Sequence, residues 1–124
     1  MTSRPPRPQS ITPHQDALDY EIAQEKAAAL GRLGRALEKA LAALSEFDRT
    51  VDLSAPTKSL SSTRRKQLVQ DAGYALWCLI VQREACGLRD PRPVLREYSV
   101  PAEVRNRMGV FGEVASRGST DLTG

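Results

Sequence analysis

The chain has 124 residues, which is enough for one ordinary domain and too few for two. Lys and Arg number 18 against 15 Asp and Glu, so the formal net charge is +3, and aromatic residues make up only 5%. Two cysteines cannot cross-link a chain of this size, which excludes a disulfide-rich secreted scaffold. The longest apolar run, Tyr74–Val81, is far shorter than the roughly 18 residues of a membrane span. The N-terminus also lacks the apolar segment of a secretory signal, so we expect a cytoplasmic protein without membrane contact.

Residues 1–12 are rich in proline and arginine, a composition typical of a disordered arm. A helix is expected to begin at Pro13, because proline lacks only a backbone donor that the first turn leaves unused, and Thr12 is suited to cap it. Good helix formers then dominate the chain without a break. These residues predict one long helix over residues 13–46.

An apolar seam runs along the second half of this helix, with alternating spacings of three and four residues that predict packing against other helices. Its members are Leu30, Leu33, Leu37, Ala40, Leu44, Phe47 and Val51. Gly31 and Gly34 lie inside the helix, where each costs about 0.5–1 kcal/mol relative to alanine. Two interpretations stay open: the glycines let another backbone approach closely, or a stable helix tolerates them.

Residues 48–62 contain turn formers and Pro56, which ends a helix, so they predict a connection. The next helix is expected over residues 63–86. One of the hydroxyl side chains at residues 61–63 caps its start, and Gly87 provides the stop that helices commonly end on.

The centre of this second helix, Tyr74–Val81, is apolar on every face. A strand is the competing interpretation of such a short run. Helix is favoured because the chain offers no convincing partner strand, and a lone strand or hairpin is marginally stable in water.

The C-terminal third predicts less regular structure. Two prolines after Gly87 indicate a loop, or one short turn of helix over residues 94–98. A proline near the start, a glutamate in the first turn and a glycine past the end predict a compact third helix over residues 101–108. We expect a single helical domain over residues 13–111 and a flexible tail over residues 112–124.

The expected fold is all-α, with the long N-terminal helix packed on the central apolar helix and a short C-terminal helix beside them. A helix over residues 13–44 would be about 48 Å long, whereas a compact monomer of this size is only about 35 Å across. A second copy would cover the central helix and complete a bundle with two-fold symmetry, so we expect a homodimer or higher oligomer. The alternative is a monomer in which the third helix and tail cover the exposed face.

The residues expected in this core or oligomer interface combine the seam with the apolar centre of the second helix. They are Leu30, Leu33, Leu37, Leu44, Phe47, Leu76, Trp77, Leu79 and Ile80.

We find no recognisable catalytic, cofactor or metal site in the sequence. His14 is the only histidine and has two aspartates nearby but no nucleophile, so a solvated residue is favoured. Cys78 and Cys86 would lie about 12 Å apart along a helix, too far for a disulfide. The sequence has one histidine and no CxxC pair, so it lacks the four Cys or His ligands of a structural zinc site. We expect neither an enzyme nor a cofactor, and the acidic residues near His14 favour a solvated face.

Arginines of the second half are candidate contacts for an anion or nucleic acid. They are Arg64, Arg65, Arg92, Arg96, Arg105 and Arg107. Arg105 and Arg107 on the short third helix suggest a helix-turn-helix reader. Against this, two prolines replace the tight turn, and acidic residues are interleaved with the arginines. Salt-bridged surface or interface arginines are therefore favoured.

Three stretches resemble short uncharacterised bacterial proteins that are grouped as a domain of unknown function. They read DALDYEIAQEKAAALGRLGRALEKAL, DAGYALWCLIVQREACGLRD and VPAEVRNRMG. The resemblance covers about residues 11–111, and it implies no activity, cofactor or catalytic residue.

The leading hypothesis for function is a non-enzymatic helical assembly or adaptor protein that acts through protein–protein contacts. Its expected partners are a second copy of itself and an unidentified protein. The alternative is a small nucleic-acid-binding regulator that uses the arginines of the C-terminal third. A phosphate-driven binder would lose affinity steeply as the salt concentration rises, which separates the two hypotheses.

Overall fold

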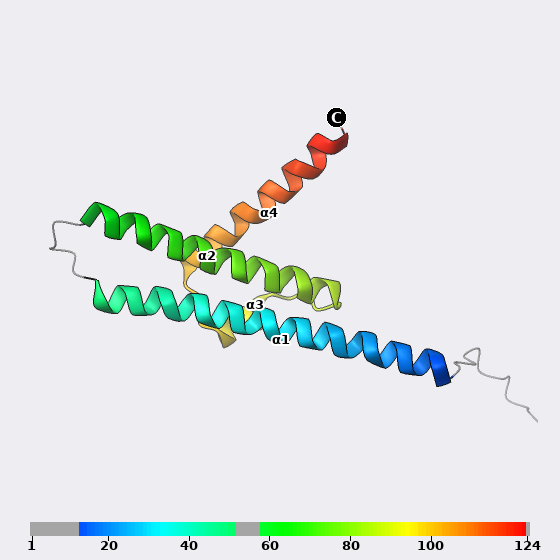
Figure 1. Cartoon of the computed structure of the whole chain (residues 1–124). Helices are drawn as coiled ribbons and strands as arrows, with labels where there is room; N and C mark the ends of the chain where they lie inside the picture. Colours follow the sequence, from blue (N-terminus) through cyan, green and yellow to red (C-terminus); the bar gives the residue numbers. More distant parts are fainter. Residues whose placement is uncertain (1–12, 52–57, 124) are drawn as a thin grey trace, which may run out of the picture.

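The computed structural model describes residues 13–51 and 58–123, with side chains up to residue 112. Within these residues the chain forms four helices and no strand, so the fold is all-α, as the sequence predicts. The helices are α1 (Pro13–Thr50), α2 (Lys58–Ala85), α3 (Arg92–Glu97) and α4 (Ala102–Thr123). Figure 1 shows α1 and α2 side by side, while α4 crosses α2 and its end runs away from the pair. The arm expected over residues 1–12 lies outside the described residues.

α1 continues past the end at residue 46 that the sequence analysis predicted. The backbone N–H of Val51 still donates to the carbonyl of Phe47, at 2.8 Å. The Thr50 hydroxyl donates to the carbonyl of Glu46 at 2.9 Å, and Arg49 forms an ion pair with the Glu46 carboxylate one turn away. The prediction of the helix end was wrong. The turn-forming residues after residue 47 indicated a connection, but local hydrogen bonds and an ion pair keep the last turn helical.

α2 begins at Lys58, well before the start at residue 63 that the sequence analysis predicted. Thr63 does not cap the helix, because its hydroxyl donates to the backbone carbonyl of Ser59 from inside the helix, at 3.1 Å. The hydroxyl residues that resemble a cap therefore belong to the first turns of α2. The middle of the preceding connection, residues 52–57, lies outside the described residues.

The end of α2 confirms Gly87 as the helix stop. Gly87 has a φ of +86°, a left-handed conformation that glycine adopts without a steric penalty. The N–H of Leu88 donates to the carbonyl of Arg83 at 2.8 Å, and the N–H of Gly87 donates to that of Glu84 at 3.0 Å. This pair of bonds is the Schellman pattern, and it satisfies carbonyls that the helix end would otherwise leave free. The last helical residue is Ala85, one position before the predicted end.

The C-terminal helices differ in how well they were predicted. Of the two interpretations left open for the segment after Gly87, α3 agrees with the short turn of helix, although it begins two residues earlier than expected, at Arg92. The predicted third helix over residues 101–108 was wrong in its end, because α4 continues to Thr123. Gly109 does not stop the helix, since it keeps a negative φ and no proline follows it in the sequence. The flexible tail expected over residues 112–124 stays a prediction.

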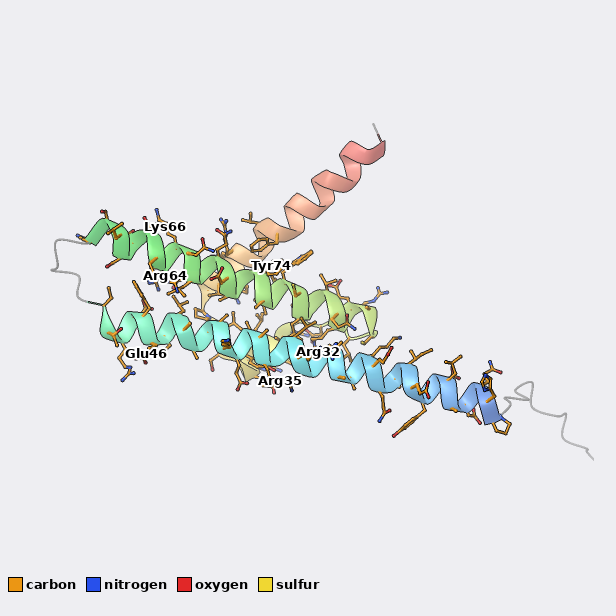
Figure 2. The ribbon with its side chains drawn as sticks, viewed as in Figure 1. Arg32, Arg35, Glu46, Arg64, Lys66 and Tyr74 are labelled. Carbon is orange, nitrogen blue, oxygen red and sulfur yellow. The ribbon has the colours of Figure 1, made fainter. Side chains whose placement is uncertain are left out.

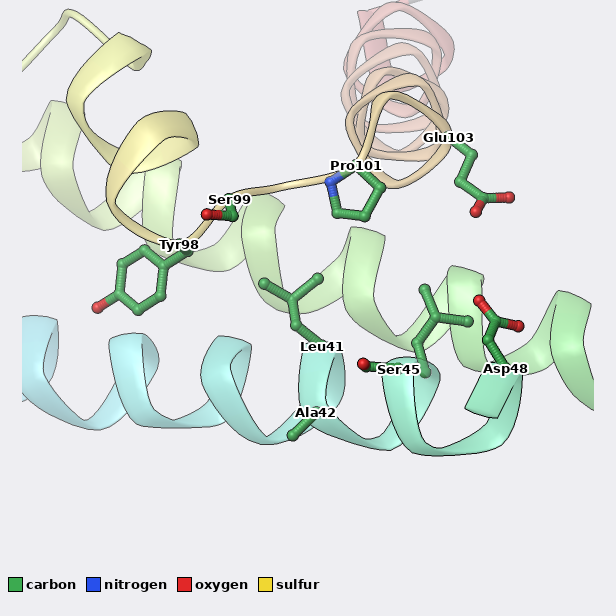
Figure 3. Close-up of a pocket in the computed structure, with 9 residues that line it drawn as sticks. Leu41, Ala42, Ser45, Asp48, Tyr98, Ser99, Pro101 and Glu103 are labelled. Atoms are coloured by element: carbon green, nitrogen blue, oxygen red, sulfur yellow. The ribbon is translucent and has the colours of Figure 1, made fainter. Parts of the chain in front are cut away.

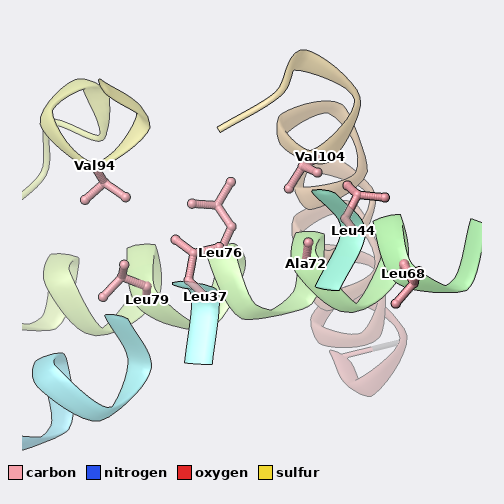
Figure 4. Close-up of a cluster of buried hydrophobic side chains, with 8 residues drawn as sticks. All are labelled: Leu37, Leu44, Leu68, Ala72, Leu76, Leu79, Val94 and Val104. Carbon is pink, nitrogen blue, oxygen red and sulfur yellow. The ribbon is translucent and has the colours of Figure 1, made fainter. Parts of the chain in front are cut away.

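The hydrophobic core lies along α2, and each of the four helices contributes at least one side chain to it (Figure 4). Its buried members are Leu37, Leu44, Leu68, Ala72, Leu76, Leu79, Val94 and Val104. Leu37 of α1, Leu76 of α2 and Val104 of α4 are fully buried, and burying such a side chain contributes about 1.5–3 kcal/mol. The chain therefore covers one side of its central helix by itself, and that side does not require a second copy.

Two glycines mark the closest approaches in this fold. Gly34 in α1 is buried against the ring of Tyr98, so a close approach does occur there, by a side chain rather than by a backbone. Gly31 meets only the side chain of Arg35, one turn along the same helix. The close backbone contact lies instead at Gly73 of α2, where α4 crosses at Arg107.

Candidate interaction surface

The residues predicted for the core or oligomer interface are brought together within one chain. Four of them are buried, namely Leu37, Leu44, Leu76 and Leu79. Four more are partly buried and pack against these, namely Leu30, Leu33, Phe47 and Ile80. Trp77 is half-buried and faces α4, with its indole nitrogen 3.9 Å from the position that a Cβ would take on Gly112. This set therefore serves the core of the single chain and leaves little of itself for a partner.

Arg65 links three helices through two carboxylates. Its guanidinium donates to Asp48 of α1, with Nε–Oδ1 at 2.7 Å and Nη2–Oδ2 at 3.0 Å. It also donates to Glu103 of α4, with Nη2–Oε1 at 2.7 Å and Nη1–Oε2 at 2.8 Å. These hydrogen bonds hold the pKa of both carboxyl groups below their usual values and raise that of Arg65. Arg65 is therefore occupied by intramolecular partners, as the favoured interpretation of the arginines expected.

A pocket of about 410 Å³ lies beside this junction, between α1 and the segment that leads into α4. Figure 3 shows Asp48 and Glu103 at one end of it, with Tyr98 at the other. Leu41 and Pro101 provide apolar walls between these ends. The pocket thus combines an apolar middle with carboxylates that Arg65 already neutralises.

A second groove, of about 450 Å³, lies between α2 and α4. Its lining includes the cations of Arg65, Lys66 and Arg107, the carboxylate of Glu103, and the polar side chains of Ser62 and Gln70. The guanidinium of Arg107 donates to Oε1 of Gln70 at 3.1 Å and lies 5.8 Å from the centroid of the Phe111 ring. Arg65 pairs with Glu103 there, whereas Lys66 and Arg107 have no ion pair within the described residues. This groove is therefore the place where the candidate arginines come nearest to an anion site.

The remaining four candidate arginines do not line this groove. Arg92 pairs with Asp90 at 3.0 Å, and the bonds from Arg92 lower the pKa of that carboxyl group. Arg64 of α2, Arg96 of α3 and Arg105 of α4 are exposed; Figure 2 labels Arg64 on α2. The six arginines are thus spread over three helices, with different local partners.

An aromatic cluster that the sequence analysis missed lies where α2 and α4 cross. The rings of Tyr74 and Phe111 meet edge to face with centroids 5.5 Å apart, and Trp77 lies 6.2 Å from Tyr74. Tyr74 keeps 53% of its surface exposed, and Val81 on the same helix keeps 43%. Tyr74 and Phe111 are distant in the sequence, so only the crossing of the helices reveals their contact.

Among the residues that the structure describes, the N-terminal part of α1 is exposed over its whole length. α1 has 38 residues against 28 in α2, which makes it about 15 Å longer at 1.5 Å per residue. Figure 1 shows its N-terminal end running on past the end of α2. All side chains of residues 13–28 are exposed, including Leu18, Tyr20 and Ile22 at 50%, 65% and 43%. We call residues 13–28 the α1 overhang.

The groups considered for chemistry in the sequence lie apart. His14 is exposed at the start of the overhang, whereas Cys78 and Cys86 are free, half-buried thiols in and just after α2. Across residues 13–51 and 58–112, no group of three or more His, Cys, Asp or Glu side chains is placed to hold a metal ion. Of the helices described, none is both long enough and apolar enough to cross a membrane.

A match over residues 6–116 identifies the family of this chain as the family of unknown function DUF6665. The chain belongs to DUF6665. The match confirms the resemblance to a domain of unknown function that was inferred from the three sequence stretches. The chain matches no curated protein and no solved structure. Membership in DUF6665 assigns no role to a residue, so the surfaces described above are the basis for a functional proposal.

Proposed function

We propose that this member of DUF6665 is a non-enzymatic assembly or adaptor protein of the cytoplasm, which acts through protein–protein contacts and associates first with a second copy of itself. The observation that carries the proposal is the α1 overhang. It exposes Leu18 and Ile22 on a stretch of helix whose side chains are all exposed in the part of the chain that the structure describes.

The physical argument concerns the stability of an unsupported helix. Isolated helices shorter than about 12–15 residues are marginal in water, because most helical stability in proteins comes from packing an apolar face. The overhang has 16 residues, slightly more than this limit, and it continues a packed helix, but its apolar side chains remain exposed among the described residues. A partner that covers Leu18 and Ile22 would provide the missing packing, and association of two copies is the simplest source.

Light scattering coupled to size exclusion tests this proposal. The wild-type chain has a mass of 13.6 kDa, and we expect about twice that value at micromolar concentration. Replacing Leu18 and Ile22 by Lys should return the mass to that of the monomer while the far-UV circular dichroism stays helical. Leu60→Lys is the matched control, because Leu60 is 69% exposed near the start of α2. A wild-type mass of 13.6 kDa at all concentrations would contradict the proposal.

The groove between α2 and α4 supports a second candidate, a small nucleic-acid-binding regulator. Lys66 and Arg107 line it without an ion pair in the described part of the chain. Phe111 beside Arg107 is an aromatic face of the kind on which bases stack. Retention on heparin or DNA at about 50 mM salt, lost on replacing Lys66 and Arg107 by Gln, would favour this function. Failure of the wild-type chain to bind under these conditions would exclude it.

A further inference from the structure

Charges are segregated along the exposed side of α1. Among residues 13–25 the ionised side chains are all acidic, namely Asp16, Asp19, Glu21 and Glu25. Among residues 26–39 basic side chains predominate, with Lys26, Arg32, Arg35 and Lys39 against Glu38. None of these side chains has an ion pair within residues 13–51 and 58–112, so each is available to a partner.

Part of this charge pattern falls on one face of the helix. Leu18, Glu25, Arg32 and Lys39 follow one another at intervals of one heptad, so they lie on one side of α1. A row with the same interval borders them on each side. One row consists of Glu21, Ala28 and Arg35, and the other consists of Ile22, Ala29 and Ala36. All of these side chains are exposed except Ala29, which is half-buried. Figure 2 labels Arg32 and Arg35 in the middle of α1.

We propose that this face pairs antiparallel with the same face of α1 in a second copy, with the two-fold axis between Ala28 and Ala29. In that register Glu25 of each copy lies opposite Arg32 of the other, and Glu21 lies opposite Arg35. Each contact occurs twice because the interface is self-complementary. This inference rests on the proposed function, and it adds the surface and the register of the self-contact.

The charge pattern selects this arrangement over the alternatives. A parallel pair in register would place the acidic half of one helix against the acidic half of the other, and like charges at an interface disfavour association. The antiparallel register instead places acidic against basic along its whole length. Alanines at the axis allow the two backbones to approach closely. Leu18 meets the aliphatic stem of Lys39 and Ile22 meets Ala36, which covers the two apolar side chains of the overhang.

The size of the contact sets its expected strength. From Leu18 to Lys39 the paired segment is about 32 Å long at 1.5 Å per residue. Two helices in contact over this length bury an area at the low end of stable interfaces, which begin near 1,200 Å². We therefore expect a dimer with micromolar affinity that weakens at high salt, because its charges are exposed.

Sedimentation equilibrium of charge-reversed full-length chains tests the register. Glu21→Lys with Glu25→Lys, and separately Arg32→Glu with Arg35→Glu, should each raise the dimer dissociation constant at least about tenfold, because every substituted position meets a like charge. All four substitutions in one chain restore opposite charges in the antiparallel register. The dimer dissociation constant of that variant should lie within about threefold of the wild-type value. Arg64→Glu, at an exposed position on α2, is the control and should leave the constant unchanged.

The outcomes separate this inference from the proposed function. If the wild type dimerises and all these variants have the same dissociation constant as the wild type, the α1 register is overturned and the assembly function stays in place. A four-fold variant that stays as weak as the double variants would also overturn the register. Growth of the wild type into larger species with concentration would point to an open-ended contact and overturn the two-fold pairing. A monomer at every concentration would overturn both proposals. Circular dichroism of each variant checks that the helices remain folded.

Discussion

The hydroxyl oxygen of Tyr98 lies 2.5 Å from the position that a Cβ atom would take on Gly34. Gly34 is buried in the middle of α1, and Tyr98 directly follows α3 and packs against the core. Burial is the main cause that raises the pKa of the Tyr98 phenol. The segment that carries Tyr98 can therefore lie against α1 only because residue 34 has no side chain.

Gly34→Ala should destabilise the fold despite the better helix propensity of alanine. The propensity gain is about 1 kcal/mol, whereas overpacking of a close contact costs typically 1–3 kcal/mol. We expect a net loss of about 1 kcal/mol in the free energy of unfolding, measured by urea denaturation.

Two further variants show whether the Tyr98 hydroxyl is the cause. In a Tyr98→Phe background the nearest ring atom lies 3.6 Å from the new Cβ, an ordinary contact, so Gly34→Ala should then be neutral or stabilising. Gly31→Ala should stabilise by about 0.5–1 kcal/mol, because its Cβ meets only the flexible end of Arg35. If Gly34→Ala had the same effect in both backgrounds, the contact would not be limiting.

Gly73→Ala should loosen the crossing of α2 and α4. Its Cβ would lie 3.0 Å from Cβ and Cγ of Arg107 and 3.3 Å from the backbone nitrogen of Met108, and a backbone cannot move aside as a side-chain end can. We expect a loss of about 1–3 kcal/mol in unfolding free energy and a change in the near-UV signal of Trp77. Gly109→Ala is the control, because its Cβ has no neighbour within 4 Å. Equal stabilities of the two variants would contradict a close crossing.

The helical periodicity of the sequence was sufficient to predict the all-α fold, and it identified four of the eight buried core residues. Leu37 and Leu44 recur at the spacing of a packed helix face, and both are buried. Helix ends were predicted less well, because they depend on local hydrogen bonds. Thr63 has the chemistry of a cap, yet its hydroxyl donates within a helix that begins a turn earlier. Gly87 was identified correctly, because a glycine stop is a strong and local signal.

The interaction surfaces were predicted only in part, since they depend on residues that are distant in the sequence. Arg65 was recognised as a candidate contact, but Asp48 and Glu103 lie 17 and 38 positions away and are brought to it by three helices. No spacing rule connects such positions. The exposure of Leu18 could not be inferred either, because it depends on where α2 ends relative to α1.

Leu37→Ala should destabilise the single chain, whatever its state of association. Leu37 is fully buried against Leu76 and its neighbours in the core. Removing such a side chain typically costs 2–5 kcal/mol through lost burial and the cavity that remains. Thermal denaturation at several protein concentrations is the measurement. Leu60→Ala should stay within about 0.5 kcal/mol of wild type, because Leu60 is 69% exposed. A small effect of Leu37→Ala would show that α1 does not pack on α2 in this way.

Arg65→Met should lower the free energy of unfolding at neutral pH. It should also make this free energy less dependent on pH in the acid range. The hydrogen bonds from Arg65 lower the pKa of Asp48 and Glu103 in the folded chain. A carboxyl group whose pKa is lower in the folded chain than in the unfolded chain stabilises the fold. This contribution is fully present at a pH above the pKa of the unfolded chain, near 4, and it is lost as the pH falls through the pKa of the folded chain. The side chains are 36% to 43% exposed, so solvent screening limits each pair to about 0.2–1 kcal/mol.

Urea denaturation at pH 7 and at pH 3 measures both effects. At pH 7 we expect Arg65→Met to lower the unfolding free energy by about 1 kcal/mol, and the difference from wild type should shrink at pH 3, where the carboxyl groups of the wild type become protonated. Arg92→Met is the matched control, because the Arg92–Asp90 pair is local and joins no two helices. Its effect at pH 7 should be smaller than that of Arg65→Met. If wild type and Arg65→Met lost stability in parallel on acidification, Arg65 would not be the residue that couples α1, α2 and α4.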